Sequence, residues 1–257
     1  MNSQKYRVVL ITGGSSGIGF EVARQMSEQG SKVIICGRSL EKLENARIKC
    51  PNLSTIACDI SEEDGRKVLI ETILRDFPDL NMLVNNAGIV YRYLLTTTGD
   101  LTERITDEWK TNYLAPVILA QSLLPLISRN NGTIVNICSG LSYIPLSIEP
   151  NYCAGKAALM SMTQSMRVQY KKLGVSVVGI YYPEVDTPFQ EGHATKRAIS
   201  PQIAAAEAIK KINNGNLEIH VKSAKMIYRL SRLMPRKALQ ILNGGISTDV
   251  ENLLRTR

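Results

Sequence analysis

The stretch that decides the fold is Val8–Gly19, which reads VVLITGGSSGIG. Its apolar start, Val8–Ile11, suits a strand that is buried on both faces of a sheet. From Ile18 onwards apolar residues recur at helical spacing until Gly30, which predicts a helix that ends there. A strand, a glycine turn and a helix in this order favour a phosphate site, because glycines admit a pyrophosphate and the helix start offers free N–H groups. The alternative is a plain tight turn.

A second strand is predicted at Lys32–Gly37, and Arg38 follows it directly. In dinucleotide sites the end of this strand contacts the adenosine ribose. A carboxylate there accepts a hydrogen bond from the 2′-hydroxyl of NAD, whereas an Arg pairs with the 2′-phosphate of NADP. Because Arg38 is present without a carboxylate, the sequence favours NADP(H) over NAD(H). The alternative is that Arg38 is only a solvated loop charge.

Apolar runs and helical patterns alternate along the chain and are joined by short connections. This alternation predicts an α/β fold: a Rossmann-type, doubly wound parallel sheet with helices on both faces. We find no internal repeat and no low-complexity linker, so we expect a single domain over residues 1–257. We place the cofactor-binding and catalytic core at 6–190, and a substrate lid with a C-terminal helical segment at 187–250.

Tyr152 and Lys156 lie four residues apart, which places a phenol and an ammonium on one face of a helix. A neighbouring cation stabilises a phenolate, so we predict that Lys156 lowers the pKa of Tyr152 and makes it useful in acid-base catalysis. Ser139 precedes them at the end of a predicted strand. Alone, this spacing is common on solvated helices, and its interpretation depends on the other motifs.

Taken together, these motifs resemble the short-chain dehydrogenase/reductase family over about residues 6 to 190. The ordered set is far more specific than any single motif. The residues that carry the resemblance are Thr12–Gly19, Asn85–Gly88, Asn112, Ser139 and the pair Tyr152-x-x-x-Lys156. The resemblance implies hydride transfer between a nicotinamide and an alcohol or carbonyl group.

The resemblance also implies a role for each matching position. Tyr152 is expected to be the general acid-base and Ser139 to polarise the substrate oxygen. Lys156 is expected to bind the nicotinamide ribose, and Asn112 to hold a water in a proton relay through Lys156. Asp59 should meet the adenine ring. The implied cofactor-binding set is Gly13, Ser15, Ser16, Gly17, Ile18, Gly19, Arg38, Asp59, Ile60, Asn86, Ala87, Gly88, Tyr152, Lys156, Val185 and Thr187, of which Thr187 should meet the carboxamide.

One departure from the family pattern follows the sixth predicted strand. Tyr182-Pro183 stands where the family usually has Pro-Gly, and Pro183 cannot adopt the positive φ that Gly permits. We therefore expect a different loop beside the nicotinamide, which affects substrate geometry more than cofactor binding. This variation and the basic C-terminal segment resemble the DltE-like branch of the family.

The composition, 44% hydrophobic and 21% charged, is that of a soluble protein. The five cysteines are odd in number, so we expect free thiols in a reducing compartment and no disulfide frame. No Cys/His spacing predicts a metal site. There is no apolar signal segment, and no apolar run approaches the roughly 20 residues that span a bilayer. We expect a cytoplasmic protein.

Much of the net charge of +8 lies near the C-terminus, because residues 219–248 contain no Asp or Glu. Their six basic residues are Lys222, Lys225, Arg229, Arg232, Arg236 and Lys237. The favoured interpretation is that the apolar face of a helix here packs on the substrate pocket or a partner subunit, and that the charges are solvated. Docking on an anionic membrane or an acidic substrate is the alternative. Without a recognition motif or interleaved aromatics, we do not expect nucleic-acid binding.

The leading functional hypothesis is an NADP(H)-dependent oxidoreductase acting on an alcohol or carbonyl compound. An apolar substrate is favoured by the candidate pocket walls, which are Tyr91, Tyr93, Leu141, Tyr143, Ile144, Pro145 and Tyr182. The alternative is a non-catalytic NADP-sensing protein of the same fold, against which the four intact catalytic positions argue. Apolar and small positions near 112–129 and 152–173 predict a homodimer or homotetramer.

Overall fold

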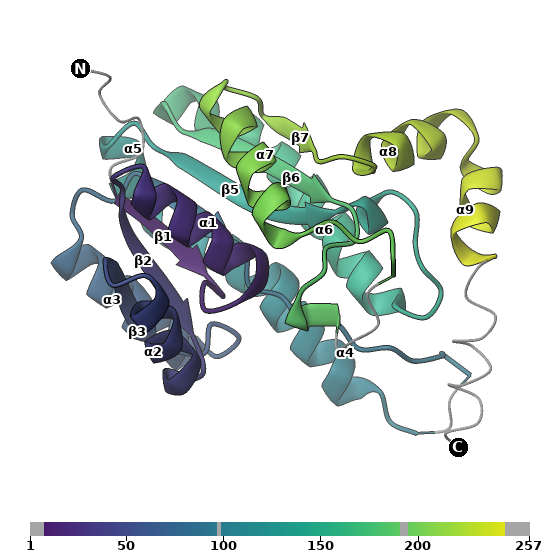
Figure 1. Ribbon diagram of the computed structural model, residues 1–257, viewed down its shortest axis with the longest axis horizontal. Helices are drawn as coiled ribbons and strands as arrows, with labels where there is room; N and C mark the ends of the chain where they lie inside the picture. The colour runs from purple at the N-terminus through teal and green to yellow at the C-terminus, as the bar shows by residue number, and fades with distance from the viewer. Residues whose placement is uncertain (1–7, 97–98, 191–194, 245–257) are drawn as a thin grey trace.

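The computed structural model describes residues 8–96, 99–190 and 195–244. Residues 1–7, 97–98, 191–194 and 245–257 of the predicted domain and its segments therefore lie outside the described residues. Within the described part, one parallel sheet has the strand order β3-β2-β1-β4-β5-β6-β7 (Figure 1). The strands are β1 (Val8–Thr12), β2 (Lys32–Gly37), β3 (Leu53–Ala57), β4 (Met82–Asn85), β5 (Thr133–Ser139), β6 (Ser176–Tyr182) and β7 (Glu218–His220). The predicted doubly wound α/β fold is confirmed.

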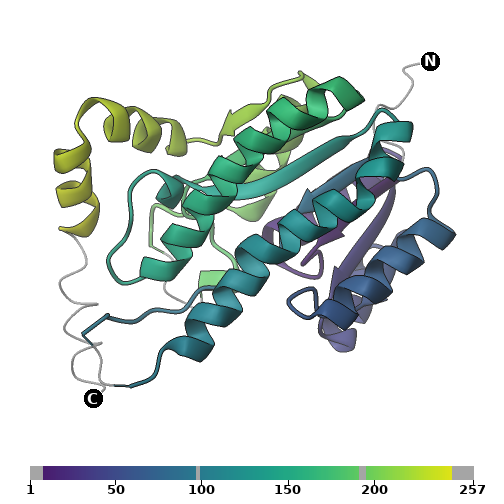
Figure 2. The same cartoon turned by 180° about the vertical axis from the view of Figure 1, so that it is seen from behind.

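Helices cover both faces of this sheet. They are α1 (Gly17–Glu28), α2 (Leu40–Lys49), α3 (Glu63–Asp76), α4 (Thr102–Trp109), α5 (Ala115–Arg129), α6 (Pro150–Tyr170), α7 (Pro201–Asn213), α8 (Ala224–Leu233) and α9 (Pro235–Asn243). Residues of α1, α2 and α7 build the core on one face, and residues of α3, α5 and α6 build it on the other. The second layer is nearest the viewer in Figure 2.

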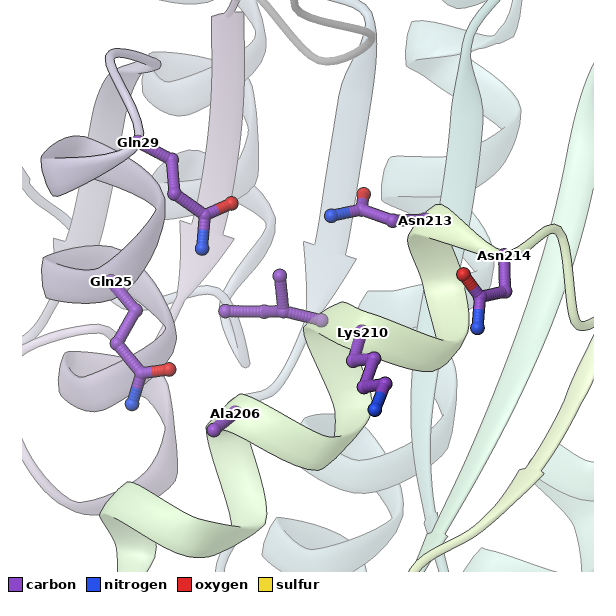
Figure 3. Close-up of a pocket in the computed structure, with 7 residues that line it drawn as sticks. Gln25, Gln29, Ala206, Lys210, Asn213 and Asn214 are labelled. Atoms are coloured by element: carbon purple, nitrogen blue, oxygen red, sulfur yellow. The ribbon is translucent and has the colours of Figure 1, made fainter.

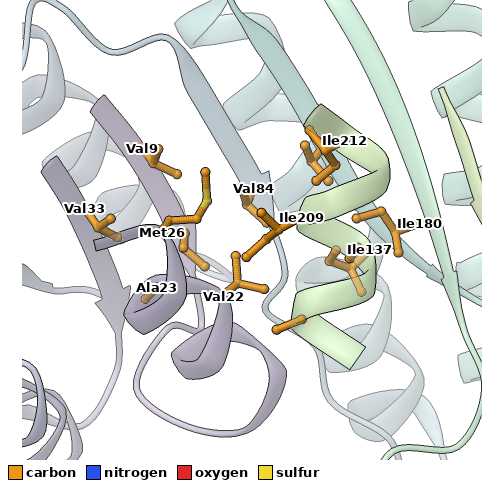
Figure 4. Close-up of a cluster of buried hydrophobic side chains, with 14 of the residues drawn as sticks. Val9, Val22, Ala23, Met26, Val33, Val84, Ile137, Ile180, Ile209 and Ile212 are labelled. Atoms are coloured by element: carbon orange, nitrogen blue, oxygen red, sulfur yellow. The ribbon is translucent and has the colours of Figure 1, made fainter. Parts of the chain in front are cut away.

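The first core layer shows why the strands are such continuous apolar runs. Val22 and Met26 of α1 and Ile209 of α7 meet Val9 and Val84 of the central strands (Figure 4). The inner strands β1 and β4 face helices on both sides, so successive residues of these strands are all buried. Burying one such side chain stabilises the fold by about 1.5–3 kcal/mol.

The strand order reverses between β1 and β4, which places a crevice at their carboxyl ends. The chain passes from β1 outward to β2 and β3 and then returns to β4 on the other side of β1. There, Val84 of β4 pairs with Ile11 of β1. Ligands of open α/β sheets bind outside the carboxyl ends of the strands at such a switch point. The glycine turn after Thr12 and the segment after Asn85 both begin at this crevice.

Two features of the fold were not anticipated from the sequence. β7 adds a seventh strand beside β6, with Ile219 next to Ile180. A π-helical turn, η1 (Lys110–Leu114), joins α4 to α5. The joined helix Thr102–Arg129 is long and apolar enough to cross a membrane, but its apolar face packs on the sheet through Leu119 and Leu123. We interpret it as a core helix.

Candidate active site

The glycine turn between β1 and α1 fits closely against the segment that follows β4. Gly13 and Gly17 adopt φ angles of 63° and 56°, in the left-handed region that favours glycine. A Cβ on Gly13 would lie 2.9 Å from Ala87 Cα. Ser16 caps α1 without a side-chain hydrogen bond, so the helix start presents its N–H groups as an anion site requires.

Thr12 and Asn86 hold these two segments together. The Thr12 Oγ1 accepts hydrogen bonds from the backbone N–H groups of Asn86 and Ala87, both at 3.0 Å. In return, Asn86 Nδ2 donates to the Thr12 carbonyl at 2.9 Å. Asn85 serves the core instead, because its Nδ2 donates to Asn136 Oδ1 at 2.9 Å. The two consecutive asparagines thus act on opposite sides of the chain.

The ends of β2 and β3 carry the residues predicted to contact the adenosine. Arg38 Nη1 lies 4.0 Å from Asp59 Oδ2, and the Arg38 side chain is 66% exposed. An exposed guanidinium in so loose a pair remains open to an incoming phosphate. Ser15 Oγ lies near Gly37 at the end of β2. The Ile60 side chain is buried in the core, so only its backbone can face a nucleotide.

The predicted catalytic pair meets where β5 ends and α6 begins. β5 delivers Ser139 next to the Tyr152 side chain. Ser139 Oγ accepts from the Leu141 N–H at 3.1 Å, which fixes its orientation. The Phe189 ring lies 5.7 Å from the Tyr152 ring, centroid to centroid, and Tyr152 is only 8% exposed. The phenol therefore sits in a largely desolvated position.

Burial shifts the pKa values of Tyr152 and Lys156 in opposite directions. It raises the pKa of Tyr152, and the negative charge of Glu149 adds to the rise, while the hydrogen bond with Ser139 acts against it. The sequence predicted a lowered value, and that direction is wrong here. Burial also lowers the pKa of Lys156 to about 8. Lys156 Nζ donates to the Ile137 carbonyl at 2.8 Å and lies 5.8 Å from the Tyr152 ring centroid. Desolvation of the phenolate is the largest influence on the pKa of Tyr152.

Asn112 and Lys156 converge on Gly88. A Cβ on Gly88 would lie 3.1 Å from Asn112 Oδ1 and 3.8 Å from Lys156 Nζ. Asn112 is fully buried, and it both accepts from the Ile89 N–H at 2.9 Å and donates to the Ile89 carbonyl at 2.8 Å. It lies within the π-helical turn η1, a geometry that occurs frequently at functional sites.

The segment after β6 closes the other side of this crevice. A Cβ on Gly17 would lie 3.2 Å from the Thr187 side chain, so Thr187 stands beside the glycine turn. Val185 forms an isolated bridge with Ile199, and Asp186 N donates to the Ile199 carbonyl at 2.9 Å. These backbone contacts shape the loop that follows Pro183.

Phe189 and the pair Arg92–Glu149 were missed by the sequence analysis. Arg92 Nε donates to Glu149 Oε1 at 3.0 Å, and Arg92 also donates to Gln190 beside Phe189. An aromatic residue two positions after Thr187 was the available signal for Phe189. Arg92 and Glu149 are far apart in the sequence, and nothing local indicates their contact.

Several predicted pocket walls are instead part of the interior. Tyr93, Ile144 and Tyr182 are buried. The Tyr143 hydroxyl forms a 3.0 Å hydrogen bond with His220 Nε2, and its ring packs against Tyr181. These residues stabilise the substrate side of the fold from within.

A hollow on the described surface lies away from these residues. It has a volume of about 400 Å³ and opens between the carboxyl ends of α1 and α7 (Figure 3). Its polar lining includes Gln25, Gln29, Lys210 and Asn213. These helices end at the amino edge of the parallel sheet, so the hollow is remote from Ser139 and Tyr152. Among the described residues, no group of three or more His, Cys, Asp or Glu could hold a metal.

This geometry agrees with the comparisons, and the chain belongs to the short-chain dehydrogenase/reductase family of oxidoreductases. The family model described as short chain dehydrogenase matches residues 7–198. Over 193 residues the chain is 39% identical to the uncharacterized oxidoreductase DltE of Bacillus subtilis (strain 168), covering 75% of this chain and 77% of that protein.

Solved structures share the fold at lower identity. A short-chain dehydrogenase from Burkholderia cenocepacia J2315, in complex with NADP, superposes with a TM-score of 0.82 at 22% identity, covering 93% of this chain and 99% of that one. A second, from Sphingobium yanoikuyae in complex with NADPH, gives 0.78 at 21% identity and covers 90% and 95% of the two chains. The family supports a nicotinamide cofactor and a small-molecule substrate.

Proposed function

We propose that this protein is an NADP(H)-dependent oxidoreductase that interconverts an alcohol and a carbonyl compound. The observation that carries the proposal is the placement of Ser139 next to Tyr152, with Lys156 beside them, at the carboxyl edge of the sheet. Two hydroxyl donors that converge on one point suit an oxygen that gains negative charge during carbonyl reduction.

The residues present fit a dinucleotide along the crevice. Gly13 and Gly17 let the turn pack closely on the segments after β4 and β6, because a Cβ on Gly13 would collide with Ala87 and one on Gly17 would press on Thr187. The uncapped start of α1 would hold the phosphates, and Gly88 with Lys156 would hold the nicotinamide ribose. The bound nicotinamide supplies or accepts the hydride.

The residues of the protein itself then transfer one proton. In carbonyl reduction, Tyr152 donates its hydroxyl proton to the substrate oxygen while Ser139 donates a hydrogen bond to the same oxygen. The positive charge on Lys156 stabilises the phenolate that remains, and Asn112 lies next to Lys156 on the inner side. Phe189 limits the access of water to Tyr152.

Preference for NADP(H) rests on Arg38. Its exposed guanidinium stands at the end of β2, where Gly37 leaves no carboxylate to accept from a ribose hydroxyl. The two solved relatives in complex with NADP and NADPH are consistent with this assignment.

The proposals for assembly and location rest on the sequence. We propose a homodimer or homotetramer that pairs through α5 and α6, because α6 exposes small and apolar positions at Ala154, Ser161 and Val168. We also propose a cytoplasmic location, in keeping with the five free cysteines. A monomer mass in light scattering across micromolar concentrations would contradict the assembly.

A substrate screen tests the function. The protein is mixed with NADPH or NADH and a panel of aldehydes and ketones, and with NADP or NAD and the matching alcohols. Absorbance of the reduced nicotinamide is followed. We expect turnover of an apolar compound with NADPH. A protein that binds NADPH but turns over no member of the panel, in either direction, would contradict the proposal.

A further inference from the structure

We propose that α8 and α9 form a surface that docks this protein on an anionic lipid bilayer. We define this α8–α9 surface by exposed apolar and basic residues of the two helices and of the turn between them. They are Lys225, Met226, Arg229, Leu233, Met234, Arg236, Lys237 and Ile241.

The inward sides of the two helices are already anchored to the protein. Ala224 and Ala238 are buried, and the Ile227 side chain packs against Gly140. At the far end, Asn243 donates to the Pro145 carbonyl at 3.0 Å and accepts from the Ser147 N–H at 2.8 Å. Because these contacts fix the helices, their outward sides cannot turn toward the core of this chain.

The outward sides nevertheless carry large apolar side chains. Met226 is 59% exposed and Leu233 is 78% exposed, and their spacing of seven residues places both on one face of α8. Ile241 of α9 is 61% exposed. The sequence favoured packing of this apolar face, but only part of it, including Ile227, turns inward. Exposed apolar side chains gathered in this way mark an interaction surface.

Charge identifies the kind of partner. Residues 219–244 contain no Asp or Glu, so the charged side chains of α8 and α9 are all cations. Lys222 reaches Glu207 at 3.7 Å. Among the described residues, Lys225 and Arg229 form no ion pair with an acidic side chain. Apolar side chains flanked by Lys and Arg suit the boundary between anionic headgroups and acyl chains. A second copy on this surface would oppose cation to cation.

The position of the surface also suits docking. α8 and α9 lie at one edge of the molecule, beyond β7, in both views (Figures 1 and 2). α8 packs against the turn Gly140–Ser142, which follows Ser139 directly. A bilayer against this surface would therefore lie beside the loop after Ser139, and the crevice at β1 and β4 would stay free for the cofactor.

Sedimentation with vesicles tests the proposal on the full chain. Vesicles of phosphatidylcholine with phosphatidylglycerol are compared with vesicles of phosphatidylcholine alone, at low and at physiological salt. We expect the protein to sediment with the anionic vesicles and not with the neutral ones, and more strongly at low salt. No sedimentation with anionic vesicles at either salt would overturn the proposal.

Two variants test separately what the cations and the apolar side chains contribute to vesicle binding. Lys225→Glu with Arg229→Glu should weaken partitioning by about 30-fold or more, since each basic residue near the surface contributes roughly 1 kcal/mol. Met226→Ser with Leu233→Ser should also weaken it, about tenfold, through lost insertion. The matched controls are Lys171→Glu with Lys172→Glu, and Ile48→Ser with Val68→Ser, at exposed positions elsewhere. Both controls should sediment like the wild type.

Further outcomes would also overturn the proposal. If Met226→Ser with Leu233→Ser leaves sedimentation unchanged, the protein is a nonspecific polycation that does not insert. If the same variant lowers the native mass in light scattering and the wild type ignores vesicles, the surface belongs to a second copy. NADPH binding by each variant confirms that it folds, because these positions are outside the cofactor crevice.

Discussion

The cofactor side and the substrate side of this site are built in different ways. The cofactor side is made by backbone: glycines with positive φ, an uncapped helix start, and a threonine that binds two N–H groups. The substrate side is made by side chains from distant parts of the chain, such as Phe189 over Tyr152 and Tyr143 against His220. Backbone requirements constrain residue type locally, whereas side-chain packing can be met by many sequences.

The largest expected effect tests the cofactor side of the site. Gly13→Val places a Cβ in collision with Ala87 and imposes about 1–2 kcal/mol of strain at a positive φ. We expect NADPH to bind at least about 100-fold more weakly, because several phosphate contacts are displaced together. Fluorescence titration with NADPH measures the affinity of both proteins.

Gly215→Val is the matched control for this variant. Gly215 also has a positive φ, of 79°, but no atom lies within 4 Å of the Cβ position. Gly215→Val should lose less stability than Gly13→Val, because only the strain at positive φ applies, and it should keep its NADPH affinity. Equal loss of affinity in both variants would show that backbone strain alone, and not the approach to Ala87, explains the result.

A somewhat smaller effect is expected at the one side chain on which cofactor choice depends. Arg38→Ala removes a charge-assisted contact with the 2′-phosphate, which is typically worth roughly 1.5–3 kcal/mol. NADPH affinity should fall by about ten- to a hundredfold, and NADH affinity should hardly change. Titration with both nucleotides decides the matter, and equal weakening of both would remove Arg38 from cofactor selection.

Lys156 belongs to both sides, and its burial predicts a pH dependence of stability. Its pKa is lowered from 10.5 to about 8 in the folded protein, so the unfolded chain binds the proton more tightly. The resulting penalty is fully present below pH 8 and is relieved as the pH rises toward 10.5. Between pH 7 and pH 9.5 the unfolding free energy of the wild type should therefore rise by about 2 kcal/mol relative to that of Lys156→Met, which has no charge to bury.

Urea unfolding of both proteins at these two pH values measures this difference. Other tyrosines and cysteines titrate in the same range, but they are common to both proteins and cancel in the comparison. A difference that does not change with pH would contradict the burial of a charged Lys156.

The smallest expected effect tests the substrate side of the site. Phe189→Ala should hydrate Tyr152, whose pKa is raised mainly by burial, and so lower that pKa. In alcohol oxidation the deprotonated form is required, so the rise of rate with pH should move to lower pH, by less than about one unit. Phe189→Leu retains an apolar cover and should shift the profile less. A shift to higher pH would argue against desolvation by Phe189.

The same division explains what the sequence could predict. The alternating fold and the approach of Gly13, Asn86 and Thr187 follow from local patterns, because each motif directly follows a strand of a parallel sheet. β7 was missed because it is short and its partner β6 lies far away in the sequence. The pKa of Tyr152 was predicted in the wrong direction because spacing reveals a neighbouring charge but not burial.

The most direct test of the central claim is to measure binding and turnover in one variant, Tyr152→Phe. This change removes the proton donor and leaves the backbone-built cofactor side intact. We predict that NADPH affinity stays within about twofold of wild type, while turnover of a substrate found in the screen falls by about 10² to 10⁴. Turnover at the wild-type rate would contradict the assignment of Tyr152 as the acid-base group.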